Sequence, residues 1–269
     1  MSGMLSVQLY SVRDALAADR PGTLARLAQI GYRYVEPFAL GFWNTPTKQL
    51  LANAHGLRAD LDAAGLAMSS VHAAIPAGSQ DAVAEVCRIL ETDTVIVAIP
   101  LLVEGLDGEV FGNREELESF AGRMNEVAHQ LADHGIRLGY HNHHFEWAEL
   151  GGGDLGFDVL WELLDPIVVA EFDVYWAVSA GQDPVEILAR LGARVVALHL
   201  KDGPGGLDDP MQPKPQVPIG AGVVDVLATV GSAPDGCWHI TEIDITDADP
   251  FELLATNRRT LINAGHTIP

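Results

Sequence analysis

Four ionisable side chains in the second half of the sequence are of the types that bind a divalent metal ion. They are Glu146, Asp173, His199 and Glu242, and the first three follow one another at nearly equal spacing. Each of them alone is compatible with a structural ion pair. Gathered in one apolar pocket without a cation, they would repel one another and lose solvation. Because this ligand set is mostly oxygen, we expect Mn²⁺, Mg²⁺ or Co²⁺, with Zn²⁺ as a further candidate.

The segment around residue 141 adds groups that could move a proton. Because side chains alternate along a strand, His141 and His143 would lie on the same face. Either imidazole could act as a general base, and Glu242 could serve as ligand and base together. The candidate catalytic residues are Glu242, Glu146, His141 and His143.

Other polar and aromatic side chains are candidates for binding a substrate. Glu36 and His72 end two further predicted strands, and Lys201 lies on the same strand face as His199. Aromatic rings that could stack on the apolar face of a sugar fall on predicted loops: Phe42, Trp43, Trp147 and Trp176. The candidate substrate-binding residues are Glu36, His72, Lys201 and Trp176.

Short β-branched runs alternate with longer amphipathic stretches along the whole chain. The predicted strands cover residues 5–10, 34–37, 67–73, 94–100, 137–142, 167–173, 195–201 and 238–244. The predicted helices cover residues 23–29, 50–64, 81–90, 114–134, 157–164, 184–191 and 250–264. Such alternation predicts parallel strands that are joined by right-handed crossovers.

Two architectures satisfy this pattern, an open doubly wound sheet and a closed barrel. A dinucleotide-binding doubly wound domain carries a glycine-rich turn after its first strand, whereas this chain reads Ser-Val-Arg-Asp at residues 11–14. We therefore predict an α/β fold with a single (β/α)8 TIM barrel over residues 1–269. Working groups in such barrels lie at the C-terminal ends of the strands, where the candidates above fall. Glu171 lies one layer deeper than Asp173, and we expect it in a buried ion pair.

The composition argues against several classes of function. With 16 basic and 37 acidic residues, the net charge of −21 repels nucleic acid and anionic membrane surfaces. Cys87 and Cys237 are too few for a disulfide framework. The N-terminal segment lacks the pattern of a signal peptide, and no apolar run is long enough to span a bilayer. These features predict a cytoplasmic protein without nucleic-acid or membrane partners.

The chain resembles the sugar phosphate isomerase/epimerase-like superfamily of xylose isomerase-like TIM barrels. The resemblance rests on Gly-Tyr-Arg-Tyr-Val-Glu at 31–36, Tyr-His-Asn-His at 140–143, Phe-Asp-Val-Tyr-Trp at 172–176, His-Leu-Lys-Asp at 199–202 and Thr-Glu at 241–242. It implies that the metal ligands are Glu146, Asp173, His199 and Glu242. Epimerases of this superfamily carry a glutamate where this chain has His141, so Glu146, His141 or His143 would take that ligand position.

The residues and the resemblance together predict a metal-dependent isomerase or epimerase of a small sugar or polyol ketone. The reaction would begin with removal of the proton next to a metal-bound carbonyl. Gly-Ala-Gly at 220–222 is a weak phosphate-binding signal among acidic residues, which favours an unphosphorylated substrate. The alternatives are a lyase or dehydratase on the same site, similar to inosose dehydratase or acting on keto-glycosides, and a barrel that binds carbohydrate without turnover. The expected partner is the sugar itself, and a homo-oligomer is compatible with this function.

Overall fold

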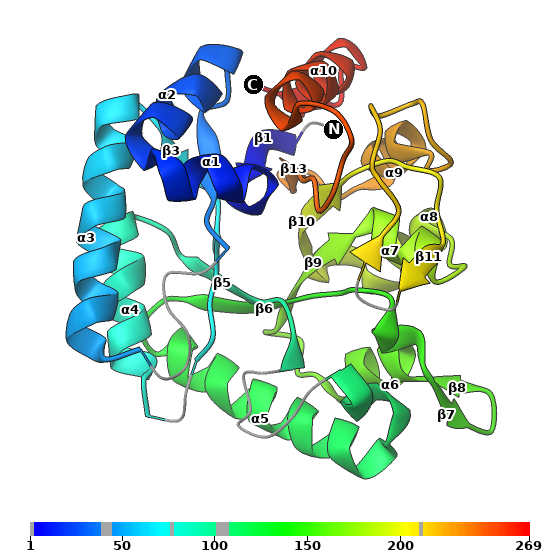
Figure 1. Ribbon diagram of the computed structural model, residues 1–269. Coiled ribbons are helices and arrows are strands. Elements are labelled where there is room, and N and C mark those ends of the chain that lie inside the picture. The colour runs from blue at the N-terminus through cyan, green and yellow to red at the C-terminus, as the bar shows by residue number, and fades with distance from the viewer. Residues whose placement is uncertain (1–2, 39–44, 76–77, 101–107, 210–211) are drawn as a thin grey trace.

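Parallel strands form a ring in the computed structural model, and helices surround the ring on its outside (Figure 1). The structure describes residues 3–38, 45–75, 78–100, 108–209 and 212–269, so the candidate stacking residues Phe42 and Trp43 lie outside it. The strands of the ring are β1 (Gly3–Gln8), β2 (Tyr34–Glu36), β3 (Ala67–Met68), β4 (Val71–His72), β5 (Thr94–Val97), β6 (Arg137–His141), β9 (Val169–Asp173), β10 (Val195–Leu200) and β13 (Trp238–Thr241).

The predicted third strand, residues 67–73, is observed as two short pieces. β3 pairs with β2 and β4 pairs with β5, so the ring continues through both pieces. Between them lie Ser69 and Ser70, whose hydroxyls hydrogen-bond to Ser6 and Glu36. The remaining strands pair in parallel with their neighbours, from β2 through β1, β13, β10, β9 and β6 to β5. The strand ring and the surrounding helices confirm the TIM barrel that the sequence predicts.

The predicted helices are observed close to their predicted ranges. Further helices that were not predicted are too short to show a periodic pattern in the sequence. The helices of the described residues are α1 (Arg13–Ala18), α2 (Arg20–Ile30), α3 (Thr47–Ala64), α4 (Gln80–Leu90), α5 (Arg114–Ala132), α6 (Gly156–Leu163), α7 (Val174–Ser179), α8 (Pro184–Leu191), α9 (Val226–Ser232) and α10 (Pro250–Asn263). Of these, α1, α7 and α9 were not predicted. α7 follows β9 without a loop, because the Asp173 carboxylate accepts a hydrogen bond from the Trp176 amide and caps the helix.

The hydrophobic core lies between the outer faces of the strands and the helices. On α5, one stripe of side chains is fully buried: Leu117, Phe120, Met124, Val127 and Leu131. Phe120 packs edge-on against Tyr140 of β6, with ring centroids 5.8 Å apart. Burying each large apolar side chain stabilises the fold by about 1.5–3 kcal/mol, so this layer holds the strand ends in place.

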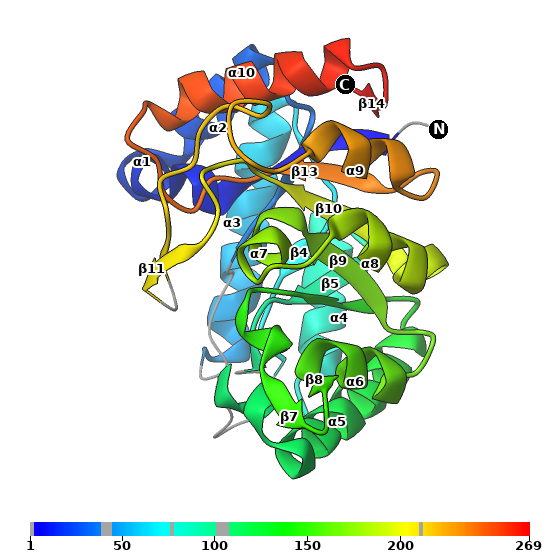
Figure 2. The ribbon, with the colours of Figure 1, turned by 90° about the vertical axis from the view of Figure 1, so that its right-hand side faces the viewer.

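Smaller elements close the two ends of the barrel. β14 (Thr267–Ile268) pairs with β1, so the first and last described segments lie side by side (Figure 2). β7 (Glu149–Gly151) and β8 (Asp154–Leu155) form one hairpin, while β11 (Leu207–Asp209) and β12 (Gln212–Pro213) form another. Among the described residues, we find no helix that is both long and apolar enough to cross a membrane.

The loop that follows β10 is organised by the buried carboxylate of Asp202. Its two oxygens accept hydrogen bonds at 2.8–3.0 Å from the backbone N–H groups of Gly203, Gly220, Gly222 and Val224. A Cβ atom at residue 222 would lie 2.2 Å from Asp202 Oδ1, so only glycine fits there. The amides of the Gly-Ala-Gly segment therefore bind a carboxylate of this chain itself.

We expect the substitution Asp202→Ala to lower the free energy of unfolding by roughly 2–4 kcal/mol, because it leaves several buried N–H donors without an acceptor. Thermal unfolding followed by circular dichroism measures the loss as a lower melting temperature. Asp225→Ala is the control, since Asp225 accepts a hydrogen bond from one amide at the N-terminus of α9 and should cost only about 1 kcal/mol. Equal losses for the two variants would contradict the role given to Asp202.

Candidate active site

The C-terminal ends of five strands bring ionisable side chains to the centre of the barrel. His72 ends β4, His141 ends β6, Asp173 ends β9, and His199 lies near the end of β10. Glu242 directly follows β13, where its amide still pairs with β10. All five side chains are buried. The structure thus brings together Asp173, His199 and Glu242, three of the four predicted metal ligands.

His141 completes a group of four with these residues. One ligand atom from each of His141, Asp173, His199 and Glu242 lies within 4.8 Å of the others. His141 Nε2 is 3.8 Å from Asp173 Oδ2, and His199 Nδ1 is 4.0 Å from that oxygen and 2.8 Å from Glu242 Oε2. Atoms bound to one ion at about 2.0–2.2 Å lie roughly 3–4 Å apart. The spacing of the group therefore fits a single divalent ion.

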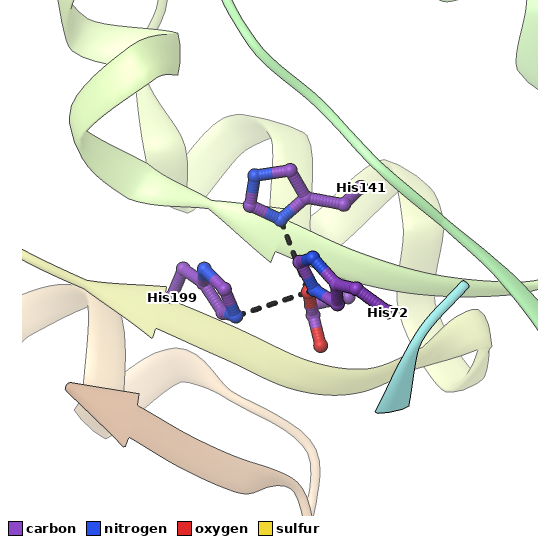
Figure 3. Close-up of side chains that lie close together, drawn as sticks. His72, His141 and His199 are labelled. Atoms are coloured by element: carbon purple, nitrogen blue, oxygen red, sulfur yellow. Dashed lines mark hydrogen bonds and ion pairs between the residues drawn. The ribbon is translucent and has the colours of Figure 1, made fainter. Parts of the chain in front are cut away.

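Glu171, one layer deeper in β9, contacts three histidines at once. Its Oε1 atom is 2.6 Å from His72 Nε2, 3.1 Å from His141 Nδ1 and 3.0 Å from His199 Nε2. Figure 3 shows these three imidazoles turned toward a common point. Because Nδ1 of His141 and Nε2 of His199 are directed at Glu171, the other ring nitrogens of these two histidines face Asp173 and Glu242. The buried ion pair predicted for Glu171 is confirmed.

The electrostatics of the cluster reflect several charges that are packed without water. Burial raises the pKa of Asp173 to about 7, because the attraction of Lys201 offsets only part of that effect. Burial and the neighbouring charge of His199 hold the pKa of His141 well below its usual range. Burial also opposes the charged form of His199, but three carboxylates around it keep its pKa well above the usual value. His141 is therefore neutral, as a metal ligand must be, while His199 would release a proton on binding an ion.

Lys201 is buried within the same cluster. Its Nζ atom lies 2.9 Å from Asp173 Oδ2, 2.5 Å from Glu242 Oε2 and 2.7 Å from Asp244 Oδ2. Burial lowers the pKa of Lys201, but the three carboxylates outweigh burial and hold it well above the usual range. The contact with Asp244 is a hydrogen bond, and the contacts with Asp173 and Glu242 are ion pairs. Lys201, a predicted substrate-binding residue, is thus held by three carboxylates of the chain itself.

Glu146, the fourth predicted ligand, lies outside the group. It follows β6 in a short helical turn, η4 (Phe145–Trp147), which directs its side chain away from the barrel centre. The Tyr140 hydroxyl donates to Glu146 Oε1 and the His143 amide to Glu146 Oε2, both at 2.8 Å. Burial raises the pKa of Glu146 to about 8, although these hydrogen bonds act in the opposite direction. His141, and not Glu146, is grouped with Asp173, His199 and Glu242 in the structure.

A cavity of about 660 Å³ lies directly above the cluster. Its lining includes three aromatic side chains and four groups that could meet a substrate: Tyr10, Phe38, Trp176, His72, His141, His143 and Glu242. Trp176 and His72 thus lie where a substrate would bind. Glu36 does not, because it is fully buried beneath His199, where Gln8 and Ser70 also donate to it.

Two other features lie away from the cluster. Trp147 stacks on Phe157 with ring centroids 4.4 Å apart, which indicates packing under the loop. A second cavity, of about 700 Å³, is lined by residues that include Trp147, His144 and Glu116 of α5, and by none of the clustered groups. The cavity above His141 and Glu242 is therefore the candidate active site.

Comparison with known proteins agrees with the architecture. The family model of the xylose isomerase-like TIM barrels matches residues 24–231, so the chain belongs to this family. The resemblance noted from the sequence motifs is confirmed.

The similar proteins include enzymes with different reactions. A segment of 100 residues, 36% of this chain, is 31% identical to an inosose dehydratase from Clostridium botulinum, and it spans about a third (32%) of that relative's length. A solved sugar phosphate isomerase/epimerase from Parabacteroides distasonis superposes with a TM-score of 0.75 at 22% identity, covering 97% of this chain and 96% of the other. A D-allulose 3-epimerase from Methylomonas sp. superposes with a TM-score of 0.66 at 13% identity, covering 98% of each chain. The two structural matches share the fold alone, and the expectation of an enzyme is confirmed at the level of the family.

If His141, Asp173, His199 and Glu242 hold a metal ion, removing the charge of Glu171 should weaken its binding, because Glu171 contacts two of these histidines. We expect Glu171→Gln to lower the affinity for Zn²⁺ about 10- to 100-fold, since its carboxylate fixes the tautomers of His141 and His199. Competition with a chelating dye measures this affinity. Glu149→Gln, at an exposed position in β7, is the matched control. An unchanged affinity in a folded Glu171→Gln protein would contradict the role of Glu171 in orienting the histidines.

Proposed function

We propose that the protein is a metal-dependent isomerase or epimerase of a small, unphosphorylated sugar or polyol ketone. The observation that carries this proposal is the group of His141, Asp173, His199 and Glu242 at the floor of the cavity. It combines an ion-binding arrangement with space for a small molecule. A cytoplasmic location and a homo-oligomer stay predictions from the sequence.

The proposed ligands are His141, Asp173, His199 and Glu242, with His141 in place of Glu146. Two imidazoles and two carboxylates favour Zn²⁺, Co²⁺ or Mn²⁺ over Mg²⁺, which prefers an all-oxygen shell. His72, His141, Glu171 and His199 form a second close group. It shares His141 and His199 with the first group but contains Glu171, which is fully buried one layer deeper, so we assign the ion to the group that contains Glu242 at the cavity. A bound ion would polarise the carbonyl of the substrate and so acidify the proton on the adjacent carbon.

Glu242 is the proposed general base. Lys201 and His199 hold its Oε2 atom, whereas no hydrogen bond joins Oε1 to any part of the chain that the structure describes. That free oxygen belongs to a side chain that lines the cavity. His143 is the second candidate, because it lines the same cavity and burial lowers its pKa to about 3, which keeps it neutral at pH 7. A neutral imidazole accepts a proton, and in its protonated form could return one.

The walls of the cavity suit an unphosphorylated sugar. Tyr10, Phe38 and Trp176 offer ring faces and edges on which the apolar side of a sugar can pack. The amides around Gly220 and Gly222, which could otherwise bind a phosphate, donate to Asp202. Both features support a substrate that is recognised through its hydroxyl groups and carbon skeleton.

A dehydratase or other lyase is the second candidate, because part of the chain is 31% identical to an inosose dehydratase. Elimination needs the same first proton transfer, followed by loss of a group from the neighbouring carbon. Glu242, which carries the proton after that first transfer, would then be the acid that protonates the leaving group. A barrel that binds carbohydrate without turnover is the third candidate, and it would require that no proton leave the bound substrate.

Exchange with solvent deuterium tests the proposal. The metal-loaded protein is incubated in D₂O with a panel of ketoses, keto-glycosides and inososes, and each recovered sugar is analysed by mass spectrometry and NMR. Deuterium at the carbon next to the carbonyl, lost when a chelator removes the metal, is the expected result. A new epimer or isomer identifies the first candidate, and a product that lacks one water identifies the dehydratase. Binding without exchange across the panel would contradict both enzymatic candidates.

A further inference from the structure

One guanidinium group lines the cavity above the metal-binding cluster. Arg13, at the start of α1, lines the cavity next to Tyr10 and near Glu242 and Asp244. Its guanidinium lies over the ring of Tyr10, 4.2 Å from the centroid, and donates to the Tyr10 carbonyl at 3.0 Å. Tyr10 in turn packs edge-on against Phe38, with ring centroids 5.3 Å apart. This stack fixes Arg13 in the wall of the cavity.

No carboxylate pairs with Arg13 among the described residues, although the protein is strongly acidic. Other arginines, such as Arg20, Arg114 and Arg190, lie within 2.9 Å of an aspartate. Lys201 lies within 2.7 Å of both Glu242 and Asp244, and Arg13 forms no ion pair with either carboxylate. A guanidinium has five N–H donors, and the contact with the Tyr10 carbonyl uses one of them. Donors for an anionic ligand therefore remain at the cavity wall.

We propose that Arg13 binds a carboxylate of the substrate, so that the site takes an acidic sugar derivative in preference to a neutral sugar. The inference rests on the proposed function for the placement of the substrate carbonyl at the cavity floor. A planar guanidinium matches a carboxylate through two parallel hydrogen bonds. The floor and the wall would then hold the two ends of one small molecule, and Arg13 would determine its orientation over Glu242.

Binding of two sugars that differ only in one carboxylate tests this proposal. Calorimetry at pH 7 with the metal-loaded protein compares D-glucuronate with D-glucose, and D-glucose 6-phosphate forms a third arm. We expect glucuronate to bind at least about 10-fold more tightly than glucose, and Arg13→Gln to remove most of this preference. Arg26→Gln is the matched control, because Arg26 also lies over an aromatic ring, 3.7 Å from the centroid of Phe251, and should keep the preference.

Three results would overturn the proposal. The parent protein could bind glucuronate no better than glucose. The preference could persist in Arg13→Gln, which would place the carboxylate on the metal. An Arg13-dependent preference for glucose 6-phosphate over glucuronate would replace the carboxylate with a phosphate. Deuterium exchange is measured separately, so selectivity without exchange would remove the proposed reaction and leave the Arg13 subsite standing.

Discussion

Replacing Glu242 by glutamine is expected to lower deuterium exchange into the substrate at least about 100-fold, the usual contribution of a positioned general base. The amide keeps an oxygen near the ion but loses the negative charge and nearly all basicity. Exchange is measured at saturating metal, because the substitution also weakens one ligand. Bound metal, determined in the same sample, separates loss of the base from loss of the ion.

Two further variants make this result specific. Glu242→Asp keeps a carboxylate and should restore part of the rate, whereas His143→Ala should reduce exchange much less than Glu242→Gln. Exchange by Glu242→Gln at the parent rate, with metal unchanged, would show that Glu242 does not take the proton. His143 would then become the proposed base, and the lyase would move ahead of the epimerase.

The substitution His141→Ala is expected to lower Zn²⁺ affinity more than about 100-fold, since removing even an indirect partner of a ligand costs 10- to 100-fold. Glu146→Gln is the matched comparison and should leave the affinity within about threefold. The reason is that both Glu146 oxygens are engaged by Tyr140 and His143. Dye competition measures both affinities, and His141→Gln provides a variant of more similar size if the alanine protein is unstable.

A larger loss of Zn²⁺ affinity in Glu146→Gln than in His141→Ala would contradict the ligand assignment. If Glu146→Gln loses the metal while His141→Ala keeps it, the turn that carries Glu146 must rearrange when the ion binds. The fold would be unaffected, but the fourth ligand would be the one that the sequence suggested first.

The barrel could be predicted because its strands and helices carry strong local signals. Residues 184–191 were predicted as a helix and are observed as α8 over the same residues, between the Asp183 cap and Gly192. The break between β3 and β4 was not predicted, because residues 67–73 were read as one strand although Ser69 and Ser70 interrupt it. The short β7–β8 and β11–β12 hairpins also lack a pattern long enough to detect.

Only part of the candidate site could likewise be predicted from the sequence. Asp173, His199 and Glu242 could be placed because each lies at the end of a predicted parallel strand. Glu146 could not, since a single turn of η4 decides whether its side chain faces the barrel centre or Tyr140. The signal for His141 was its place at the strand end, on the face that also carries His143.

The roles of Glu171 and Asp244 depend on distances between strands that are remote in sequence. Glu171 contacts imidazoles from β4, β6 and β10, and Asp244 meets Lys201 beyond the end of β13. Strand alternation could indicate that Glu171 points inward. Only the assembled barrel shows that one oxygen of Glu171 contacts three histidines.

Anomalous diffraction from crystals soaked in Mn²⁺ tests the central claim most directly. We predict one anomalous peak at the cavity floor, within about 2.0–2.3 Å of His141 Nε2, His199 Nδ1 and carboxylate oxygens of Asp173 and Glu242. A peak bonded to Glu146, a peak between His72 and Glu171, or no peak near Asp173 and Glu242 at saturating Mn²⁺ would contradict the account.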